Sequence, residues 1–238
     1  EIQRAVTEPD YCSDRLELLA RCELQLPVVS AHRVGTAVCD LIDGRHRPIL
    51  PDYVWGDGDT EGVRRRATEE MMATLRVAQR LGATVVSGFT GSTLWGSVNG
   101  WPHLPREMFD AAMKDFADRW LPILDVCRET GVKFAFEVHP WQIAFDYYSA
   151  ETVLEAVGER EEFGFTFHPS HFHPQGFDPV ELLRRIADRI YHVHVKDRVR
   201  NPNGRNSVHS ISLPAPAPGR ASPFRPPGHR GFGWSLAL

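Results

Sequence analysis

Three apolar stretches of this 238-residue chain each end in side chains that can bind a metal ion or transfer a proton. They read FAFEVHP at 134–140, FTFHPSH at 165–171 and YHVHVKD at 191–197. Each stretch has the residue types of a β-strand, and a helix-like segment precedes each of them. This alternation predicts βαβ units and a parallel sheet. Because the carboxyl ends of parallel strands meet at one face, the polar groups after the three strands are expected to lie close together.

The rest of the chain continues the same alternation. Further strands are predicted at 26–32 (LPVVSAH) and 83–91 (ATVVSGFTG), so that five strands are separated by four helical connections. The segment 33–58, which contains prolines and glycines, is expected to be a long loop. No GxGxxG or GxxxxGK[ST] motif follows the first strand, which removes the main support for a nucleotide-binding open sheet. Catalytic groups at the ends of several different strands favour a barrel.

Helices are indicated by apolar spacing together with residues that begin or end a helix. Asp59 or Thr60 is expected to cap the helix before the second strand, and Ser149 is expected to cap the helix before the fourth strand. Gly82 and Gly131 are expected to end the two helices that precede them. The predicted helices cover 9–24, 61–82, 105–131, 149–159 and 178–189.

Four side chains at the predicted strand ends are the candidates for a metal site: Glu137, His168, His171 and His194. An uncompensated carboxylate would be costly to bury, which favours metal ligation for Glu137. A carboxylate with imidazoles suits Mn²⁺, Mg²⁺, Co²⁺ or Zn²⁺ and does not choose among them. The alternatives are a solvated strand-end acid or salt-bridge partner at Glu137, and core histidines with satisfied hydrogen bonds at His171 and His194.

Other residues near the same strand ends are candidates for substrate binding. His32 ends the predicted strand 26–32 and is either a substrate contact or a histidine that caps the loop. His139 could line the mouth of the site, and Lys196 could contact substrate or simply be exposed. Lys196 and Asp197 could also orient His194 through indirect contacts. His192 lies on the same side of its strand as His194 but one layer deeper, and is interpreted as structural.

Composition excludes several classes of protein. No run approaches the ~18–20 apolar residues that span a bilayer, and the first ten residues lack the features of a signal peptide. The four cysteines form no CxxC pair and are expected to be reduced, as in a cytoplasmic protein. The sequence contains no GxSxG motif, so serine-nucleophile chemistry has no support.

The charged residues are unevenly distributed along the chain. Every acidic residue lies within 1–197, whereas 198–238 contains six arginines, seven prolines and no Asp, Glu or Lys. The segment 198–238 has no apolar periodicity and is expected to be an irregular tail outside a barrel formed by 1–197. An arginine-rich arm for nucleic acid is one alternative, but scattered arginines beside an acidic body do not favour it. An out-of-frame or aberrant terminus is the other alternative, and it is favoured. No nucleic-acid partner is therefore predicted.

The motifs VVSAH, VVSGFTGS, FAFEVHP, FHPSH and YHVHVKD resemble those of the xylose-isomerase-like barrels. This family includes sugar-phosphate isomerases and epimerases, inosose dehydratases and endonuclease IV. The resemblance implies that Glu137, at the end of the family's fourth strand, binds a divalent metal and transfers protons. It also implies that His171 matches the His of an Asp-x-x-His signature, in which His168 takes the place of Asp. His168 is then either a replacement ligand without the negative charge, which lowers the affinity for hard cations, or a substitution that damages the site. His194 matches the family's ligand after the sixth strand.

The resemblance also has departures. The family has eight strands, and this chain is expected to lack the first strand and recognisable seventh and eighth strands. The family's last ligand, a Glu, has no counterpart after Asp197. The expected fold is therefore an incomplete α/β barrel of the TIM type, with about five to six parallel strands of eight and an atypical C-terminal end. Its unpaired edges invite association, so a homo-oligomer is possible.

The function implied by the resemblance is a metal-dependent isomerisation or epimerisation of a sugar, sugar phosphate or polyol keto compound. Glu137 and His171 are the implied catalytic residues, with a small carbohydrate as the partner. Dehydration of a keto-inositol is the alternative from another reaction class. A catalytically impaired barrel fragment is the alternative that is not an enzyme. Endonuclease-type cleavage of DNA is disfavoured, because the body of the chain is acidic.

Overall fold

The computed structural model describes residues 1–94, 101–172, 175–198 and 224–228. In this part of the chain five parallel strands form one sheet, in which each strand pairs with the strand that precedes or follows it in sequence. The strands are β1 (Val28–Ser30), β2 (Val85–Gly88), β3 (Lys133–Glu137), β4 (Phe163–Phe167) and β5 (Ile190–Val193). This sequential order is that of a TIM-type barrel, and the sheet curls into half of one. The predicted incomplete barrel is confirmed.

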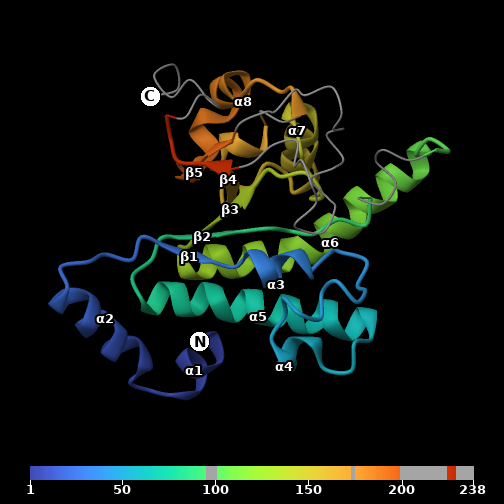
Figure 1. The fold of residues 1–238 in the computed structure, drawn as a ribbon. Coiled ribbons are helices and arrows are strands. Elements are labelled where there is room, and N and C mark those ends of the chain that lie inside the picture. The colour runs from blue at the N-terminus through green and yellow to red at the C-terminus, as the bar shows by residue number, and fades with distance from the viewer. Residues whose placement is uncertain (95–100, 173–174, 199–223, 229–238) are drawn as a thin grey trace.

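The helices alternate with the strands along the chain. In Figure 1, α5 and α6 lie together beneath β1 and β2, and α7 and α8 lie near β4 and β5. The helical elements are α1 (Ile2–Thr7), α2 (Tyr11–Arg21), α3 (His32–Thr36), α4 (Asp52–Trp55), α5 (Thr60–Arg80), α6 (Arg106–Thr130), α7 (Tyr147–Ala156), α8 (Pro179–Ile186) and the 3₁₀ turns η2 (Pro169–His171) and η4 (Ala187–Arg189). None of these described helices is both long and apolar enough to cross a membrane.

The structure confirms the expected N-terminal cap of α5 and corrects that of α7. Asp59 caps α5 by accepting a hydrogen bond from the Gly62 N–H, as expected. The expected cap of α7 was wrong, because Asp146 rather than Ser149 begins this helix. Ser149 instead takes the reciprocal position of a capping box, in which each side chain bonds the backbone N–H of the other residue. Both are good capping residues, and their spacing of three made either assignment possible.

The segment 33–58 was expected to be a loop, and the structure corrects this by placing α3 and α4 within it. His32 accordingly begins α3 and does not end a strand. Gly35 explains how such a short helix is held against the sheet. A Cβ at this position would lie 2.1 Å from the carbonyl oxygen of Phe89, just after β2. Only glycine permits this close approach of two backbones, which brings α3 to the ends of the strands.

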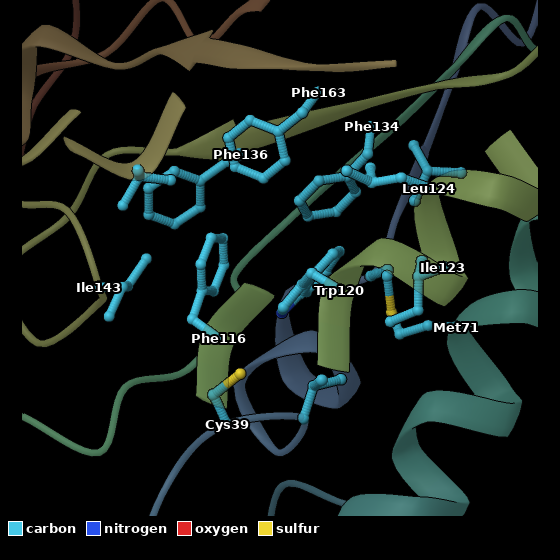
Figure 2. Packing of buried hydrophobic residues seen from close by; sticks show 14 of the residues in the cluster. Cys39, Met71, Phe116, Trp120, Ile123, Leu124, Phe134, Phe136, Ile143 and Phe163 are labelled. Carbon is cyan, nitrogen blue, oxygen red and sulfur yellow. The ribbon is translucent and has the colours of Figure 1, made fainter. Parts of the chain in front are cut away.

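The core between the sheet and the helices is rich in aromatic residues. Figure 2 shows Phe134 and Phe136 of β3 beside Phe116 and Trp120 of α6, with Phe163 of β4 next to them. The Trp120 and Phe134 rings are 4.4 Å apart between centroids. All five side chains are fully buried, and burying a large apolar side chain contributes about 1.5–3 kcal/mol. This packing holds β3 and β4 in the positions from which the site is built.

The opposite face of the strands is small and polar. The Ser87 hydroxyl of β2 lies 2.7 Å from the Thr166 hydroxyl of β4, and the Thr166 hydroxyl donates to the carbonyl oxygen of Ala135 in β3. Side chains alternate along a strand, so Glu137 faces the same inner side as Ala135. The inner face of the half-barrel therefore leads to the carboxylate of Glu137.

Most of the tail 198–238 lies outside the described residues. Within the described part, β6 (Asp197–Arg198) pairs antiparallel with β7 (Phe224–Arg225). The Phe224 ring makes cation–π contacts with two side chains. Lys196 Nζ lies 3.8 Å and Arg198 Cζ 4.6 Å from the ring centroid. The division of the chain at residue 197 remains a prediction.

Candidate functional site

Glu137 is the centre of the site. It is the last residue of β3, and only 3% of its surface is exposed. One carboxylate oxygen, Oε1, lies 3.0 Å from His168 Nδ1 and 2.9 Å from His171 Nε2. The other oxygen, Oε2, lies 3.1 Å from His32 Nε2 and 2.7 Å from His194 Nδ1. A single buried carboxylate thus contacts four imidazoles, two through each oxygen.

Each histidine reaches Glu137 from a different place near the strand ends. His168 directly follows β4, and His171 lies in the 3₁₀ turn η2. His194 follows β5, and its N–H donates to the carbonyl oxygen of Phe167, which keeps its backbone beside β4. His32 is the first residue of α3, after β1. The convergence expected for parallel strand ends is therefore present, although these residues are far apart in sequence.

Burial and hydrogen bonding compete in setting the charge of this cluster. Burial acts to raise the pKa of Glu137, but the contacts with His168, His171, His194 and His32 outweigh it and hold the pKa well below its usual range. Burial lowers the pKa of His168 and drives the pKa of His171 well below its ordinary value. At neutral pH the centre is therefore an ionised carboxylate beside two neutral imidazoles. Neutral imidazole is the form that binds metals.

The donor atoms have the spacing of metal ligands. They form two groups that share Glu137, and in each group all ligand atoms lie within 4.8 Å of one another. His168 and His171 complete the first group, and His32 and His194 complete the second. Two ligands that each bind an ion at about 2.0–2.2 Å are roughly 3–3.6 Å apart for angles between 90° and 109°. The contacts of 3.0 and 2.9 Å in the first group lie at the short end of this range.

Buried polar atoms without a hydrogen-bond partner also fit a metal site. The Nε2 atom of His168, the Nδ1 atom of His171 and the hydroxyl of Ser170 are buried and have no hydrogen-bond partner among the described residues. Buried polar atoms in native proteins nearly always have a partner, which can be an ion. The residues present therefore fit a divalent metal.

His139 lies beside this cluster. Its ring is 4.0 Å from the ring of His171 and 5.0 Å from that of Phe89, measured between centroids. Its Nδ1 atom contacts the carbonyl oxygen of Pro140, and burial lowers the pKa of His139 to about 4. A neutral ring at this place can hydrogen-bond a substrate without adding charge.

Lys196, Asp197 and His192 belong to neither ligand group. Lys196 is exposed and lies over the Phe224 ring, so its ammonium group is engaged at the rim of the site. Asp197 is fully buried, and one of its oxygens accepts from the Arg198 N–H. The ring of His192 is 4.9 Å from that of His194, and burial lowers the pKa of His192.

A cavity of about 670 Å³ adjoins the cluster. Its walls include His32, Phe89, His139 and Trp141 on the side of the cluster, and Arg33 and His46 farther away. This volume is in the range of sites for small molecules. His32 and His139 are thus placed where both the ligand cluster and a bound molecule can be reached.

Sequence reasoning missed the polar residues that shape this cavity. The Gln142 side chain accepts from the N–H groups of Thr90 and Gly91, at 3.0 and 2.7 Å, and donates to the Thr36 hydroxyl. Asp40 contacts His46 Nε2 at 3.1 Å and accepts from the Ser92 N–H. These residues lie in segments without periodicity, so no local signal marks them. Their roles follow from contacts between distant segments.

Comparisons with known proteins agree with this architecture. A family model described as "Xylose isomerase-like TIM barrel" matches residues 5–234. The inosose dehydratase of Geobacillus kaustophilus (strain HTA426) is 27% identical over 92 residues, which are 39% of this chain and 30% of that protein. The matched stretch therefore spans less than a third of that curated relative.

Solved structures share the fold. The apo form of 3-keto-D-glucoside 4-epimerase from E. coli matches with a TM-score of 0.58 and 14% identity, over 85% of this chain and 71% of that chain. A xylose isomerase-like TIM barrel protein from Mycobacterium smegmatis, solved in complex with magnesium, matches with a TM-score of 0.55 and 16% identity. That match covers 84% of this chain and 61% of that chain.

Proposed function

Because this chain belongs to the xylose isomerase-like TIM barrel family, we propose that it is a metal-dependent isomerase or epimerase of a sugar, sugar phosphate or other polyol keto compound. The observation that carries this proposal is the ionised carboxylate of Glu137, buried among four imidazoles beside a cavity of small-molecule size. Such a carboxylate can accept a proton from carbon and return it.

Glu137, His168, His171 and His194 would hold the divalent ion. A bound ion would polarise the carbonyl oxygen and the neighbouring hydroxyl oxygen of a ketose. The proton on the carbon next to the carbonyl would then be more acidic. Glu137 is the proposed base that removes and returns this proton. Its Oε2 atom also contacts His32, which is not one of the four proposed ligands, so the carboxylate can bind the metal and still be held in place. His171 is proposed to orient the substrate as well.

His32 has contacts that suit a substrate-positioning role. Its Nδ1 atom lies 2.8 Å from the Ser30 hydroxyl, while its Nε2 atom contacts Glu137. When Ser30 donates to Nδ1, the ring proton is on Nε2 and is donated to the carboxylate. His139, which lines the same cavity, is also proposed to bind substrate. Lys196, which lies over the Phe224 ring, is the third proposed substrate contact.

Exchange of solvent deuterium into substrate tests the proposal. The full chain would be incubated in D₂O with a panel of ketoses and with Mg²⁺, Mn²⁺, Co²⁺ or Zn²⁺ in turn. We expect incorporation at the carbon beside the carbonyl together with formation of the isomer. Glu137→Gln should lower the rate by at least about 100-fold, because general-base catalysis is typically worth 10²–10⁴. The exposed Glu155 provides the matched control, since Glu155→Gln removes a carboxylate far from the site.

The same experiment separates the alternatives. Loss of water from a keto-inositol would identify a dehydratase, which the partial match to an inosose dehydratase favours as the second candidate. Dehydration also begins with proton abstraction next to a carbonyl, so it uses the same residues. Absence of exchange with every metal and substrate would contradict both reactions and would indicate an impaired barrel fragment.

A further inference from the structure

We infer that the Glu137 centre is a zinc-type centre, selective for Zn²⁺ and Co²⁺ over Mg²⁺ and Mn²⁺, and that His168 sets this selectivity. The preference rests on the metal binding that we propose above, but not on the reaction. It concerns which ion the residues of this chain can hold, and it can be measured without any substrate.

The donor atoms favour a borderline metal. The two ligand groups contain one carboxylate and four imidazoles, and no other Asp or Glu of the described residues joins them. Mg²⁺ prefers oxygen ligands and Mn²⁺ is well served by them, whereas imidazole suits Zn²⁺ and its neighbours in the transition series. One carboxylate with two histidines is a donor set of catalytic zinc sites.

The burial of the first group points to the same ions. Glu137, His168 and His171 are all buried, and the two imidazoles approach the same carboxylate oxygen, at 3.0 and 2.9 Å. Mg²⁺ loses its water reluctantly and usually keeps several water molecules in a nearly ideal octahedron. A closely packed, buried group with few oxygen atoms satisfies that requirement poorly. Zn²⁺ accepts three protein ligands and one open position.

His168 is the residue on which the selectivity depends. Its ring lies between its neighbours, 4.1 Å from the ring of His171 and 5.0 Å from that of His194. Its Nδ1 atom contacts Glu137 Oε1 at 3.0 Å, and its Nε2 atom is buried without a hydrogen-bond partner among the described residues. Within this part of the chain, no other polar contact assigns the ring another role. An Asp at this position would put a second carboxylate beside Glu137. The donor set would then become harder and more negative, which favours Mg²⁺ and Mn²⁺.

Metal affinities of the apo protein test this inference. The full chain would be stripped of metal, and the association constants of Zn²⁺, Co²⁺, Mn²⁺ and Mg²⁺ would be measured by calorimetry and by competition with a chromophoric chelator. Many imidazole sites prefer zinc, so the diagnostic quantity is the change in the Zn²⁺-to-Mn²⁺ ratio of association constants. We expect His168→Asp to lower this ratio by at least about tenfold.

His192→Asp is the matched control, because His192 is near His194 but belongs to neither ligand group. It should leave the ratio within about twofold of the unchanged protein. The inference is overturned if the unchanged protein binds Mg²⁺ or Mn²⁺ as tightly as Zn²⁺, or if both variants change the ratio equally. The affinities of the unchanged protein show whether it prefers Zn²⁺ to Mg²⁺ and Mn²⁺, even where a variant fails to fold. Isomerisation supported by Mg²⁺ alone would overturn the zinc selectivity and leave the proposed reaction standing. Zinc selectivity without proton exchange would support the inferred selectivity and contradict the proposed reaction.

Discussion

At the scale of single residues, the site combines the charged carboxylate of Glu137 with three histidines, His168, His171 and His139, whose pKa values are lowered. Burial opposes the ionisation of Glu137, yet four imidazole contacts more than compensate. Burial also opposes protonation of His168, His171 and His139. Unfolding releases both constraints, because each group then returns to its ordinary pKa. The apo protein should therefore lose stability in acid, since the unfolded chain binds more protons than the folded one.

His139 offers a direct test of this pH dependence. Its pKa is about 4 in the folded protein and about 6.5 when unfolded, so between these values only the unfolded state is protonated. Stability is therefore present above the unfolded pKa and is lost as the pH falls towards 4. Replacing this histidine in His139→Asn should make the free energy of unfolding less dependent on pH than in the unchanged protein. The slope against pH should fall by up to about 1.4 kcal/mol per pH unit.

Urea unfolding of the metal-free protein at several pH values from 7 to 5 provides the measurement. The control is His103→Asn, which changes an exposed histidine and should keep the original pH dependence. If His139→Asn and the unchanged protein lose stability equally on acidification, the buried neutral state of His139 is incorrect.

At the scale of elements, helix α5 holds the wall of the cavity through one arginine. Arg64 is buried, and its guanidinium donates to the carbonyl oxygens of Asp40 and Cys39, at 2.9 and 2.6 Å. It also forms an ion pair with Glu61. These contacts fasten the chain after α3 to α5, and Asp40 in that chain lines the cavity. Arg65, the next residue, is paired among the described residues with Glu69 on the surface.

Replacing the two arginines separately should show this difference. Arg64→Met would leave two carbonyl oxygens without their charged donor and should cost about 2–4 kcal/mol of unfolding free energy. Arg65→Met removes only an exposed ion pair and should cost less than about 1 kcal/mol. Chemical denaturation of both variants gives the comparison, and equal losses would mean that the buried contacts of Arg64 do not stabilise the fold.

At the scale of the whole molecule, the half-barrel has open edges. Among the described residues, β1 pairs only with β2 and β5 pairs only with β4. Unpaired strand edges offer backbone donors and acceptors to another chain. Val193 at the end of β5 is 40% exposed, so an apolar side chain accompanies this edge. The possible homo-oligomer anticipated from the sequence would form here.

Sedimentation velocity over a range of concentrations should therefore show self-association. Val193→Lys places a charge at the β5 edge and should shift the distribution towards the monomer. Val6→Lys makes the same exchange at an exposed valine of α1, away from the sheet, and should leave association unchanged. A monomer at all concentrations, or an equal response of the two variants, would contradict association through this edge.

Much of the fold was predictable because its signals are local. Apolar runs bounded by turn residues marked all five strands, and capping residues such as Asp59 and Gly131 marked the helix ends. The parallel order then required the strand ends to meet, which was enough to bring Glu137, His168, His171 and His194 together as candidates. These four candidates could be identified from residue type and from their position after a predicted strand, and both can be read from the sequence.

The remaining features depend on contacts between segments that are distant in sequence. Arg64, Arg65 and Arg66 are adjacent and chemically identical, and the packing of α5 determines that Arg64 is buried. His32 reaches Glu137 across 105 positions because Gly35 lets α3 pack against the end of β2. Nor does any local pattern show that the two oxygens of Glu137 face different histidine pairs. That division depends on the curl of the sheet and on the turns after its strands, which three-dimensional packing sets.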